Sequence, residues 1–249
     1  VRAIKLCNNK IKRVTLMKHI AYIICLLFTI QASADEIDSI INNFAVESID
    51  ATIVQIIAET GKPTIRYEGR YRAYKQNMRI DYSKPFPQIV IIKGGNLQWY
   101  YPESKELWIM QNVSAPVTHP FAQFFAFKDR IVIQRKENTY YGFFKSAYRY
   151  MLVDTSTRTK IELVIDKQKG YPIKKITSTA DNIEIMRELY EDYMYINAVW
   201  FPATVEVIAR THNGTTRNVT RYYNVHLNGK VPPDIFTLQI PKGVTVKHM

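Results

Sequence analysis

Short segments in which apolar and polar residues alternate are the feature that most constrains the fold of this chain. In the segment 160–166, Ile161, Leu163 and Ile165 alternate with polar neighbours such as Glu162. A period of two residues places successive side chains on opposite faces of a strand, so such a strand has one dry face and one wet face. The pattern therefore predicts antiparallel β-sheet.

Fourteen segments of strand character recur along most of the chain, and we expect them to give roughly ten or eleven strands, with two or three short helices. This predicts a mainly β (α+β) fold built on one large, curved antiparallel sheet with helices on one side. A sheet this wide needs its concave face covered or occupied. The segments are 53–59, 65–74, 78–82, 88–93, 96–101, 106–111, 130–135, 149–154, 160–166, 173–179, 183–195, 203–210, 219–227 and 236–240.

Turn residues between three of these segments predict how they connect. Gly94 and Gly95 separate 88–93 from 96–101, and both glycines tolerate the positive φ that a two-residue hairpin turn requires. The residues 102–105 then supply ordinary turn chemistry before the next segment. We therefore expect three successive strands joined as a meander.

Two apolar segments have helical spacing instead. Residues such as Ile37, Ile40 and Ile41 predict an amphipathic helix over 36–46. A second, short and very apolar helix is expected over 119–127, where a proline suits the first helical position.

The amino-terminal region is typical of a secretory signal. An unbroken apolar run over 20–30 follows basic residues, and Ala32 and Ala34 provide the small residues that a signal peptidase requires before a cut at Asp35. A retained membrane anchor is the alternative, but a transmembrane helix needs about 20 apolar residues and the run is shorter. We expect cleavage and export.

Domain boundaries follow from this interpretation. Met17 begins a compact leader on its own, so residues 1–34 are interpreted as upstream residues plus a cleavable signal peptide with the true start at Met17. No Pro/Gly/Ser tract, charge block or repeat interrupts the rest. The residues 35–249 are therefore expected to form a single domain.

Both cysteines, Cys7 and Cys25, fall in the leader. The mature chain is thus predicted to have no disulfide and no thiolate for catalysis or zinc. Cys25 follows two isoleucines where a lipid-attachment site would place a small residue, so we expect no lipid anchor and a soluble mature protein.

The net charge falls when the leader is removed. Of 34 basic residues, six lie in the leader, and the remainder against 22 acidic residues leaves a net charge of +6. Basic residues alternate with tyrosines over 66–79, which could also describe a stripe that stacks nucleic-acid bases. The pattern favours a strand with an inward aromatic face and solvated cations, and we expect no nucleic-acid partner.

An enzyme is the main alternative class. The histidines are not paired with an acid or a second ligand at metal-site spacing, and no nucleophile elbow, phosphate loop or zinc motif is present. Asp81 and Asp154 with Glu162 are the acids that could form a catalytic pair, but acids on alternating strands usually belong to the wet face. We expect no catalysis, no cofactor and no metal.

Four segments in order resemble the periplasmic outer-membrane lipoprotein carrier family, LolA. The residues 69–85 resemble its glycine-led strand and its Met-Arg-aromatic-acid-Tyr strand, and 88–105 resemble its Trp-Tyr hairpin. The residues 119–125 take the place of its Pro-Leu helix. The closing 229–244 resemble its Pro-Asp, Phe and Pro-Lys-Gly-Val ending.

This resemblance implies an incomplete β-barrel lidded by short helices, with an apolar cavity for lipoprotein acyl chains. It implies a periplasmic carrier that shuttles lipoproteins from the inner to the outer membrane. The implied partners are acylated lipoproteins, an inner-membrane lipoprotein-release transporter and an outer-membrane acceptor, through transient membrane-protein contacts. The residues expected to line the cavity are Met78, Ile80, Ile91, Leu97, Trp99, Trp108, Phe121, Phe124 and Phe125; simple core packing is the alternative for each.

The chain departs from the family at one point. An Arg-Pro pair commonly precedes the Met-Arg strand, and its arginine is tied to lid closure and ligand release, whereas this chain has Tyr74 and Lys75 there. Lys75, or Arg72 on the same strand, could supply the charge.

Other roles on the same fold stay open, because a fold does not fix a function. A lipoprotein receptor would need a lipidated cysteine at the mature amino terminus, and a stress-sensing regulator would need a second domain. A periplasmic lipid-binding protein with another role, as a sensor or in lipid transfer, is the main alternative, and a hydrolase is a weaker one.

Overall fold

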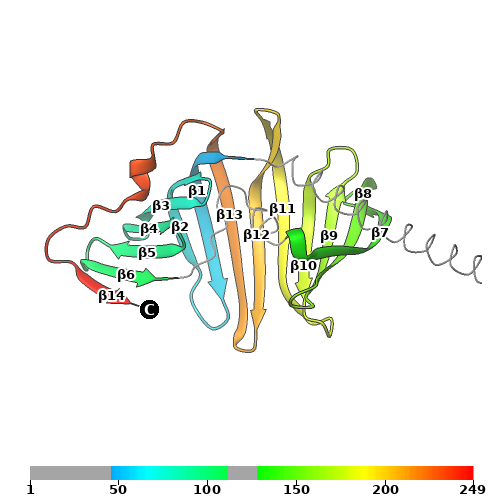
Figure 1. The fold of residues 1–249 in the computed structure, drawn as a ribbon, viewed down its shortest axis with the longest axis horizontal. Helices are drawn as coiled ribbons and strands as arrows, with labels where there is room; N and C mark the ends of the chain where they lie inside the picture. The colour runs from blue at the N-terminus through cyan, green and yellow to red at the C-terminus, as the bar shows by residue number, and fades with distance from the viewer. Residues whose placement is uncertain (1–45, 112–127, 249) are drawn as a thin grey trace, which may run out of the picture. The chain divides into compact units, whose positions relative to one another are not determined.

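The computed structural model describes residues 46–111 and 128–248, which form a single sheet of 14 strands (Figure 1). Two short 3-10 helices, η1 (Lys128–Arg130) and η2 (Pro233–Phe236), accompany the sheet. The strands are β1 (Ser48–Glu59), β2 (Ile65–Tyr74), β3 (Asn77–Lys84), β4 (Gln88–Lys93), β5 (Asn96–Tyr101), β6 (Glu106–Met110), β7 (Ile131–Tyr141), β8 (Lys145–Asp154), β9 (Lys160–Asp166), β10 (Pro172–Ser178), β11 (Glu184–Ile196), β12 (Val199–Thr211), β13 (Gly214–Leu227) and β14 (Thr245–His248).

The strand order is β14-β6-β5-β4-β3-β2-β1-β13-β12-β11-β10-β9-β8-β7. Two meanders, β1 to β6 and β7 to β13, run outward from the central pairing of β1 with β13, in which Ile49 lies opposite Leu227. Neighbouring strands are antiparallel, apart from β14, which runs parallel to β6. The sheet is open and curved, so the expected mainly β fold with an incomplete barrel is confirmed.

Several predicted strands agree with the structure residue for residue, namely those at 65–74, 88–93, 96–101 and 160–166. The hairpin turn is also confirmed, because Gly94 and Gly95 have φ values of 55° and 76°. The predicted count of strands was too low.

The strand predicted over 236–240 is wrong. Phe236 ends η2, and the residues after it form no strand before Thr245. Pro232 and Pro233 lack a backbone N–H to donate to a ladder, so this proline pair favours a turn. The predicted helices over 36–46 and 119–127 lie outside the described residues, apart from Val46, which is buried and not helical.

The alternation of residues gives the sheet two different faces. Residues directly opposite one another in the strand register share a face, so the register assigns each side chain. One face, here the apolar face, carries Ile49, Ala51 and Ile53 of β1, and Phe201 and Val205 of β12, all buried. The opposite face is the polar face.

The middle of the apolar face forms the tightest core. Val46, Ile49, Ala51, Val199, Phe201 and Leu227 pack together there. Full burial of an aliphatic or aromatic side chain contributes roughly 1.5–3 kcal/mol. These contacts join the two meanders, since β1 belongs to the first and β12 and β13 to the second.

Ion pairs mark the polar face across the sheet. Arg217 contacts Glu206 at 2.7 Å and Lys174 contacts Glu162 at 2.8 Å, in both cases between neighbouring strands. Partly exposed pairs of this kind contribute little to stability, typically about 0–1 kcal/mol each. Their main consequence is that this face has a different chemistry from the apolar one.

The carboxy-terminal segment packs on the polar face of β3 and β4. Phe236 is buried there, and Arg79 Nη1 donates a hydrogen bond to the Ile235 carbonyl at 2.8 Å. The chain then reaches β6, where the backbone N–H of Thr245 donates to the Lys105 carbonyl at 2.9 Å. This part of the polar face is therefore covered.

Candidate functional site

Two rows of apolar side chains cross β3 to β6 on the apolar face. The strand register sets Met78, Ile92, Leu97 and Met110 side by side in the first row, and Ile80, Val90, Trp99 and Trp108 in the second. Side chains directly opposite each other on neighbouring strands lie about 4.5–5.5 Å apart at Cβ. We call these eight residues the apolar rows.

The apolar rows are not sealed like the middle of the sheet. Apart from the buried Ile92, their side chains are half-buried or exposed, and Met110 is 38 % exposed. By contrast, Ile49 and Phe201 are completely buried. The rows therefore leave apolar area available to an apolar ligand, and burying it would contribute about 25 cal/mol per Å².

Polar atoms of the aromatic side chains near the rows have partners. Trp99 Nε1 donates to Gln88 Oε1 at 2.7 Å, and Tyr82 Oη donates to Gln55 Oε1 at 2.8 Å. Trp99 also stacks on Tyr101, with ring centroids 5.4 Å apart. A ligand on this surface would thus meet ring faces and methyl groups whose neighbouring polar atoms are already satisfied.

Aromatic side chains continue the apolar face toward the centre of the sheet. Tyr222 of β13 contacts Tyr71 of β2 and Phe201 of β12, with ring centroids 6.0 Å and 5.3 Å apart. Burial raises the pKa of Tyr71 and of Tyr82 above the ordinary tyrosine value. Both hydroxyls therefore stay neutral, which suits an apolar surface.

The apolar face also carries ion pairs. At its edge Lys247 of β14 contacts Glu106, with its Nζ 4.7 Å from the centroid of the Trp108 ring, and a buried pair lies farther along the sheet. Lys175 Nζ is 2.5 Å from Glu188 Oε2, and the two side chains are only 7 % and 6 % exposed. Tyr190, also buried, donates from its hydroxyl to Glu188 at 3.1 Å. Leu163 lies directly opposite Lys175, so the pair has an apolar neighbour in the sheet.

The structure brings together five of the nine residues expected to line a cavity: Met78, Ile80, Leu97, Trp99 and Trp108 all belong to the apolar rows.

Ile91 is separated from these five by the alternation of β4. It lies opposite Arg79 and Gln98 on the polar face, where it is buried. The remaining three, Phe121, Phe124 and Phe125, lie outside the described residues, as do Ala32, Ala34 and Asp35 at the predicted cleavage site.

Sequence reasoning missed other members of the surface. Val90, Ile92 and Met110 complete the rows, and Tyr71 and Tyr222 extend the face. Val90 and Ile92 could have been found by counting outward from the Gly94-Gly95 turn, because a two-residue hairpin fixes which residues face each other. Met110 could have been found by alternation, because it lies two residues after Trp108 on the same strand. Tyr222 depends on the pairing of β1 with β13, for which no local signal exists.

The three candidates for a lid or release contact occupy different positions. Arg72 lies on the polar face and donates to Asp81, which also accepts from Arg79. Tyr74 is the last residue of β2 and lies opposite Ser48 and Asn77. Lys75 is exposed in the following turn at φ 52°, with its Nζ 5.2 Å from the Tyr74 ring centroid.

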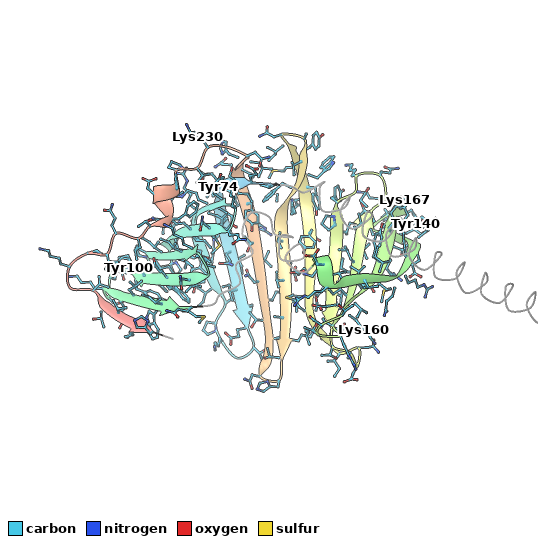
Figure 2. All side chains as sticks on the ribbon, in the orientation of Figure 1. Tyr74, Tyr100, Tyr140, Lys160, Lys167 and Lys230 are labelled. Carbon is cyan, nitrogen blue, oxygen red and sulfur yellow. The ribbon has the colours of Figure 1, made fainter. Side chains whose placement is uncertain are left out.

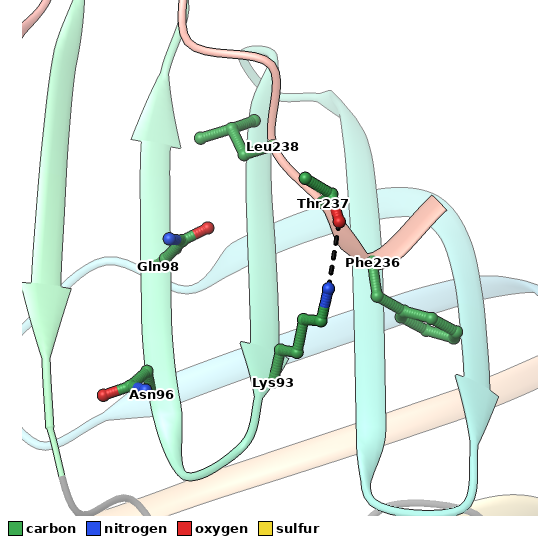
Figure 3. Close-up of a pocket in the computed structure, with 6 residues that line it drawn as sticks. All are labelled: Lys93, Asn96, Gln98, Phe236, Thr237 and Leu238. Carbon is green, nitrogen blue, oxygen red and sulfur yellow. Dashed lines mark hydrogen bonds between the residues drawn. The ribbon is translucent and has the colours of Figure 1, made fainter. Parts of the chain in front are cut away.

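A small hollow lies on the polar face beneath the carboxy-terminal segment (Figure 3). Lys93, Asn96 and Gln98 line it from β4 and β5, and Lys93 Nζ donates to Thr237 Oγ1 at 3.0 Å. Its lining is mostly polar, and this hydrogen bond ties the segment to the sheet. We assign the hollow a structural role.

Within residues 46–111 and 128–248, no group of three or more His, Cys, Asp or Glu side chains could hold a metal ion. The same part of the chain contains no helix long and apolar enough to cross a membrane.

Comparisons with known proteins identify the fold. No family model matches the chain, and no curated protein matches it. Solved structures do match. A LolA superfamily protein from Nitrosomonas europaea is 16 % identical, with a TM-score of 0.57, over 81 % of this chain and 97 % of that one.

Two further structures agree. A putative outer membrane lipoprotein-sorting protein domain from Vibrio parahaemolyticus is 12 % identical, with a TM-score of 0.62, over 83 % of this chain and 96 % of that one. A DUF1329 family protein from Desulfovibrio piger is 12 % identical, with a TM-score of 0.60, over 84 % of this chain and 97 % of that one. The chain therefore has a LolA-like fold.

Proposed function

We propose that this protein is a periplasmic carrier that binds the acyl chains of lipoproteins on its apolar face and shuttles them from the inner to the outer membrane. The observation that carries this proposal is the pair of apolar rows across β3 to β6, where half-buried apolar side chains lie side by side on an open sheet. The fold, which this chain shares with a lipoprotein-sorting protein domain, supports the same assignment.

The chemistry of the rows suits acyl chains. Each methylene group buried from water contributes about 0.8 kcal/mol, so a carrier needs a broad dry surface to keep acylated cargo soluble. It must also release the cargo, which favours an adaptable lining. Met78 and Met110 lie in the first row, and methionine packs without a fixed geometry.

The partners of the proposed carrier follow from its task. Export by the leader of residues 1–34 would deliver a single domain, 35–249, to the periplasm. An inner-membrane lipoprotein-release transporter would supply the acylated cargo, and an outer-membrane acceptor would take it. We assign the protein no catalytic role.

Release needs a group that weakens cargo binding. Arg72 already shares Asp81 with Arg79, so moving it would leave a carboxylate with one fewer donor. Lys75 is exposed in a turn, and its ammonium group can move at lower cost. We therefore favour Lys75 over Arg72 and Tyr74 as the release contact.

A transfer assay tests the proposal. Inner-membrane vesicles that contain the release transporter and a labelled lipoprotein are incubated with the protein, and soluble lipoprotein is measured. Leu97→Glu places a charge in the apolar rows and should lower the soluble fraction about tenfold or more. Asn96→Glu adds the same charge one residue away on the polar face, opposite Lys93, and should leave transfer unchanged.

Mass spectrometry of apolar molecules that co-purify with the protein separates the two main alternatives. Bound lipid together with lipoprotein release supports the carrier. Bound lipid without any release from the vesicles rejects the carrier and leaves a lipid-binding protein with another role, such as a sensor.

A further inference from the structure

The hairpin turn between β7 and β8 exposes two aromatic side chains at its tip. Phe143 is 93 % exposed and Phe144 is 82 % exposed, while Tyr140 just before the turn is 70 % exposed. The two rings contact each other edge to face, with centroids 6.1 Å apart. Apolar side chains this exposed, held next to one another, indicate an interaction surface.

The backbone conformation of this turn does not favour a phenylalanine. Phe144 has a φ of 55°, a left-handed conformation that is unfavourable for a residue with a bulky side chain, and Gly142 before it has a φ of 49°. An Asn or Gly at position 144 would relieve the unfavourable φ. The presence of Phe there is thus not explained by the needs of the turn.

Basic residues surround the aromatic tip. The turn between β9 and β10 lies beside it, because the backbone N–H of Lys167 donates to the Ser146 carbonyl at 3.0 Å. Figure 2 shows Tyr140 and Lys167 at the same corner of the sheet. Lys145, Lys167 and Lys169 are exposed, and the residues 140–146 and 167–171 contain no acid.

The aromatic surface extends to the start of β12. Lys169 Nζ lies 4.4 Å from the centroid of the Trp200 ring, and Tyr195 lies 4.8 Å from the same ring between centroids. Tyr195 is itself exposed. Trp and Tyr side chains are enriched where proteins meet the headgroup region of a bilayer, and lysines near them reach the anionic headgroups.

We infer that this corner of the sheet, the tip formed by Tyr140, Phe143, Phe144, Lys145, Lys167 and Lys169, docks on the surface of an anionic lipid bilayer. The two phenylalanines enter the headgroup and acyl boundary, and the lysines pair with anionic headgroups. The exposed lysines beside the two rings match the charge of an anionic bilayer surface. The inference goes beyond the carrier role, since docking at the tip requires no cargo.

Vesicle flotation tests this inference. The protein, as isolated from the producing cell, is floated with vesicles of phosphatidylcholine alone or of phosphatidylcholine mixed with phosphatidylglycerol. Binding is expected to the mixed vesicles. The double variant Phe143→Ser with Phe144→Asn should lower the apparent affinity about tenfold or more.

A matched control is Ile183→Ser. Ile183 is 63 % exposed in the connection between β10 and β11, so the substitution removes another exposed apolar side chain, and it should not alter flotation. The variant Lys167→Gln with Lys169→Gln should lower the affinity about fivefold per lysine at low salt, and added salt should remove that difference. Circular dichroism melting checks that each variant is folded.

Equal flotation of the tip variants and the unaltered protein would overturn the inference. The binding would then come from a part of the protein that all variants share, such as the amino terminus. Failure of the unaltered protein to bind mixed vesicles would also overturn it. If the tip variants then impaired delivery to an outer-membrane acceptor, the tip would be a protein contact. Failure of the unaltered protein to bind cargo at the apolar rows would instead count against the proposed carrier and leave the flotation result intact.

Discussion

Lys175 and Glu188 are ionisable side chains in the apolar face, and their burial has an energetic cost. Removing each charge from water costs several kcal/mol, and the contact of 2.5 Å offsets this only because the partners are close and Tyr190 donates a further hydrogen bond. Neither charge is stable there alone. The pair therefore makes the structure of this half of the face sensitive to single substitutions.

The Lys175→Met variant should lower the free energy of unfolding by about 3 kcal/mol or more, because it leaves Glu188 as a buried, unpaired charge. Adding Glu188→Leu should restore most of that loss, since both charges are then gone. Urea denaturation of the two single variants and the double variant measures this. If the double variant lost the sum of the two single effects, the two residues would not act as a pair.

The cavity residues show what local sequence could predict at this scale. Trp99 and Leu97 alternate with Asn96 and Gln98, so their face is evident from β5 alone. In β4 the run Ile89-Val90-Ile91-Ile92 is apolar on both faces, because the carboxy-terminal segment covers its polar-face side chains as well. Such a run carries no alternation, which is why Ile91 was grouped with residues of the other face.

Among the elements, β2 and β3 pair closely around Gly69. A β-bulge between Glu68 and Gly69 shifts the register there. A Cβ added at Gly69 would lie 2.5 Å from the Asp81 carbonyl oxygen and 2.9 Å from the Tyr82 Cα. Both are backbone atoms, so the strands would have to separate to admit it.

Gly69→Ala should therefore lower the free energy of unfolding by about 1–3 kcal/mol, as overpacking does. Gly229→Ala is the matched control, because a Cβ there meets nothing within 4 Å. Its effect should stay within about 0.5 kcal/mol. Thermal or urea unfolding of both variants checks the comparison, and an equal loss in the two would contradict the steric account.

Predicted elements were accurate where two signals coincided. The strands β4 and β5 combine apolar content with an intervening Gly-Gly turn, and their predicted bounds agree with the structure. β14 is only four residues long and its pattern Thr-Val-Lys-His carries no such signal; it forms because the chain returns beside β6, where Lys247 pairs with Glu106. A strand fixed by tertiary contacts in this way cannot be predicted from local sequence.

In the molecule as a whole, the fold depends on one long-range pairing. β1 and β13 are far apart in the sequence and join the two meanders at the centre of the sheet. The sequence predicts only part of the first meander, β4 to β6, through its turns, and the pairing between the meanders is decided by burial of the apolar face. Folds with such non-local contacts are expected to fold slowly, on a scale of roughly milliseconds to seconds.

Stability of the whole domain should fall in acid. The Ser156 hydroxyl and backbone N–H hold the pKa of Asp154 below its ordinary value, and Arg70 does the same for Asp50. A lowered pKa stabilises the fold above the unfolded value of about 4, and that contribution is lost as the pH falls through the folded value. The melting temperature should therefore be flat from about pH 7 to 5 and decline below about pH 4.

Asp154→Asn should reduce the fall in melting temperature at acid pH, since the substituted side chain no longer titrates. Asp181→Asn, at an exposed position, is the control and should leave that fall unchanged. Melting curves of both variants between neutral and acid pH provide the comparison. An acid decline of the same size in Asp154→Asn would show that other groups are responsible.

The contact between acyl chains and the apolar rows can be measured directly through the three tryptophans of the chain. Trp99 and Trp108 lie in the rows, whereas Trp200 lies on the polar face opposite Tyr195. Trp200→Phe keeps only the first two, and Trp99→Phe with Trp108→Phe keeps only the third. A lysophospholipid with a brominated acyl chain is added below its critical micelle concentration, and tryptophan fluorescence is measured. The bromine atoms should quench the fluorescence of the first variant and leave that of the second unchanged. Quenching of Trp200 alone, or lipid binding without quenching of Trp99 and Trp108, would contradict the account.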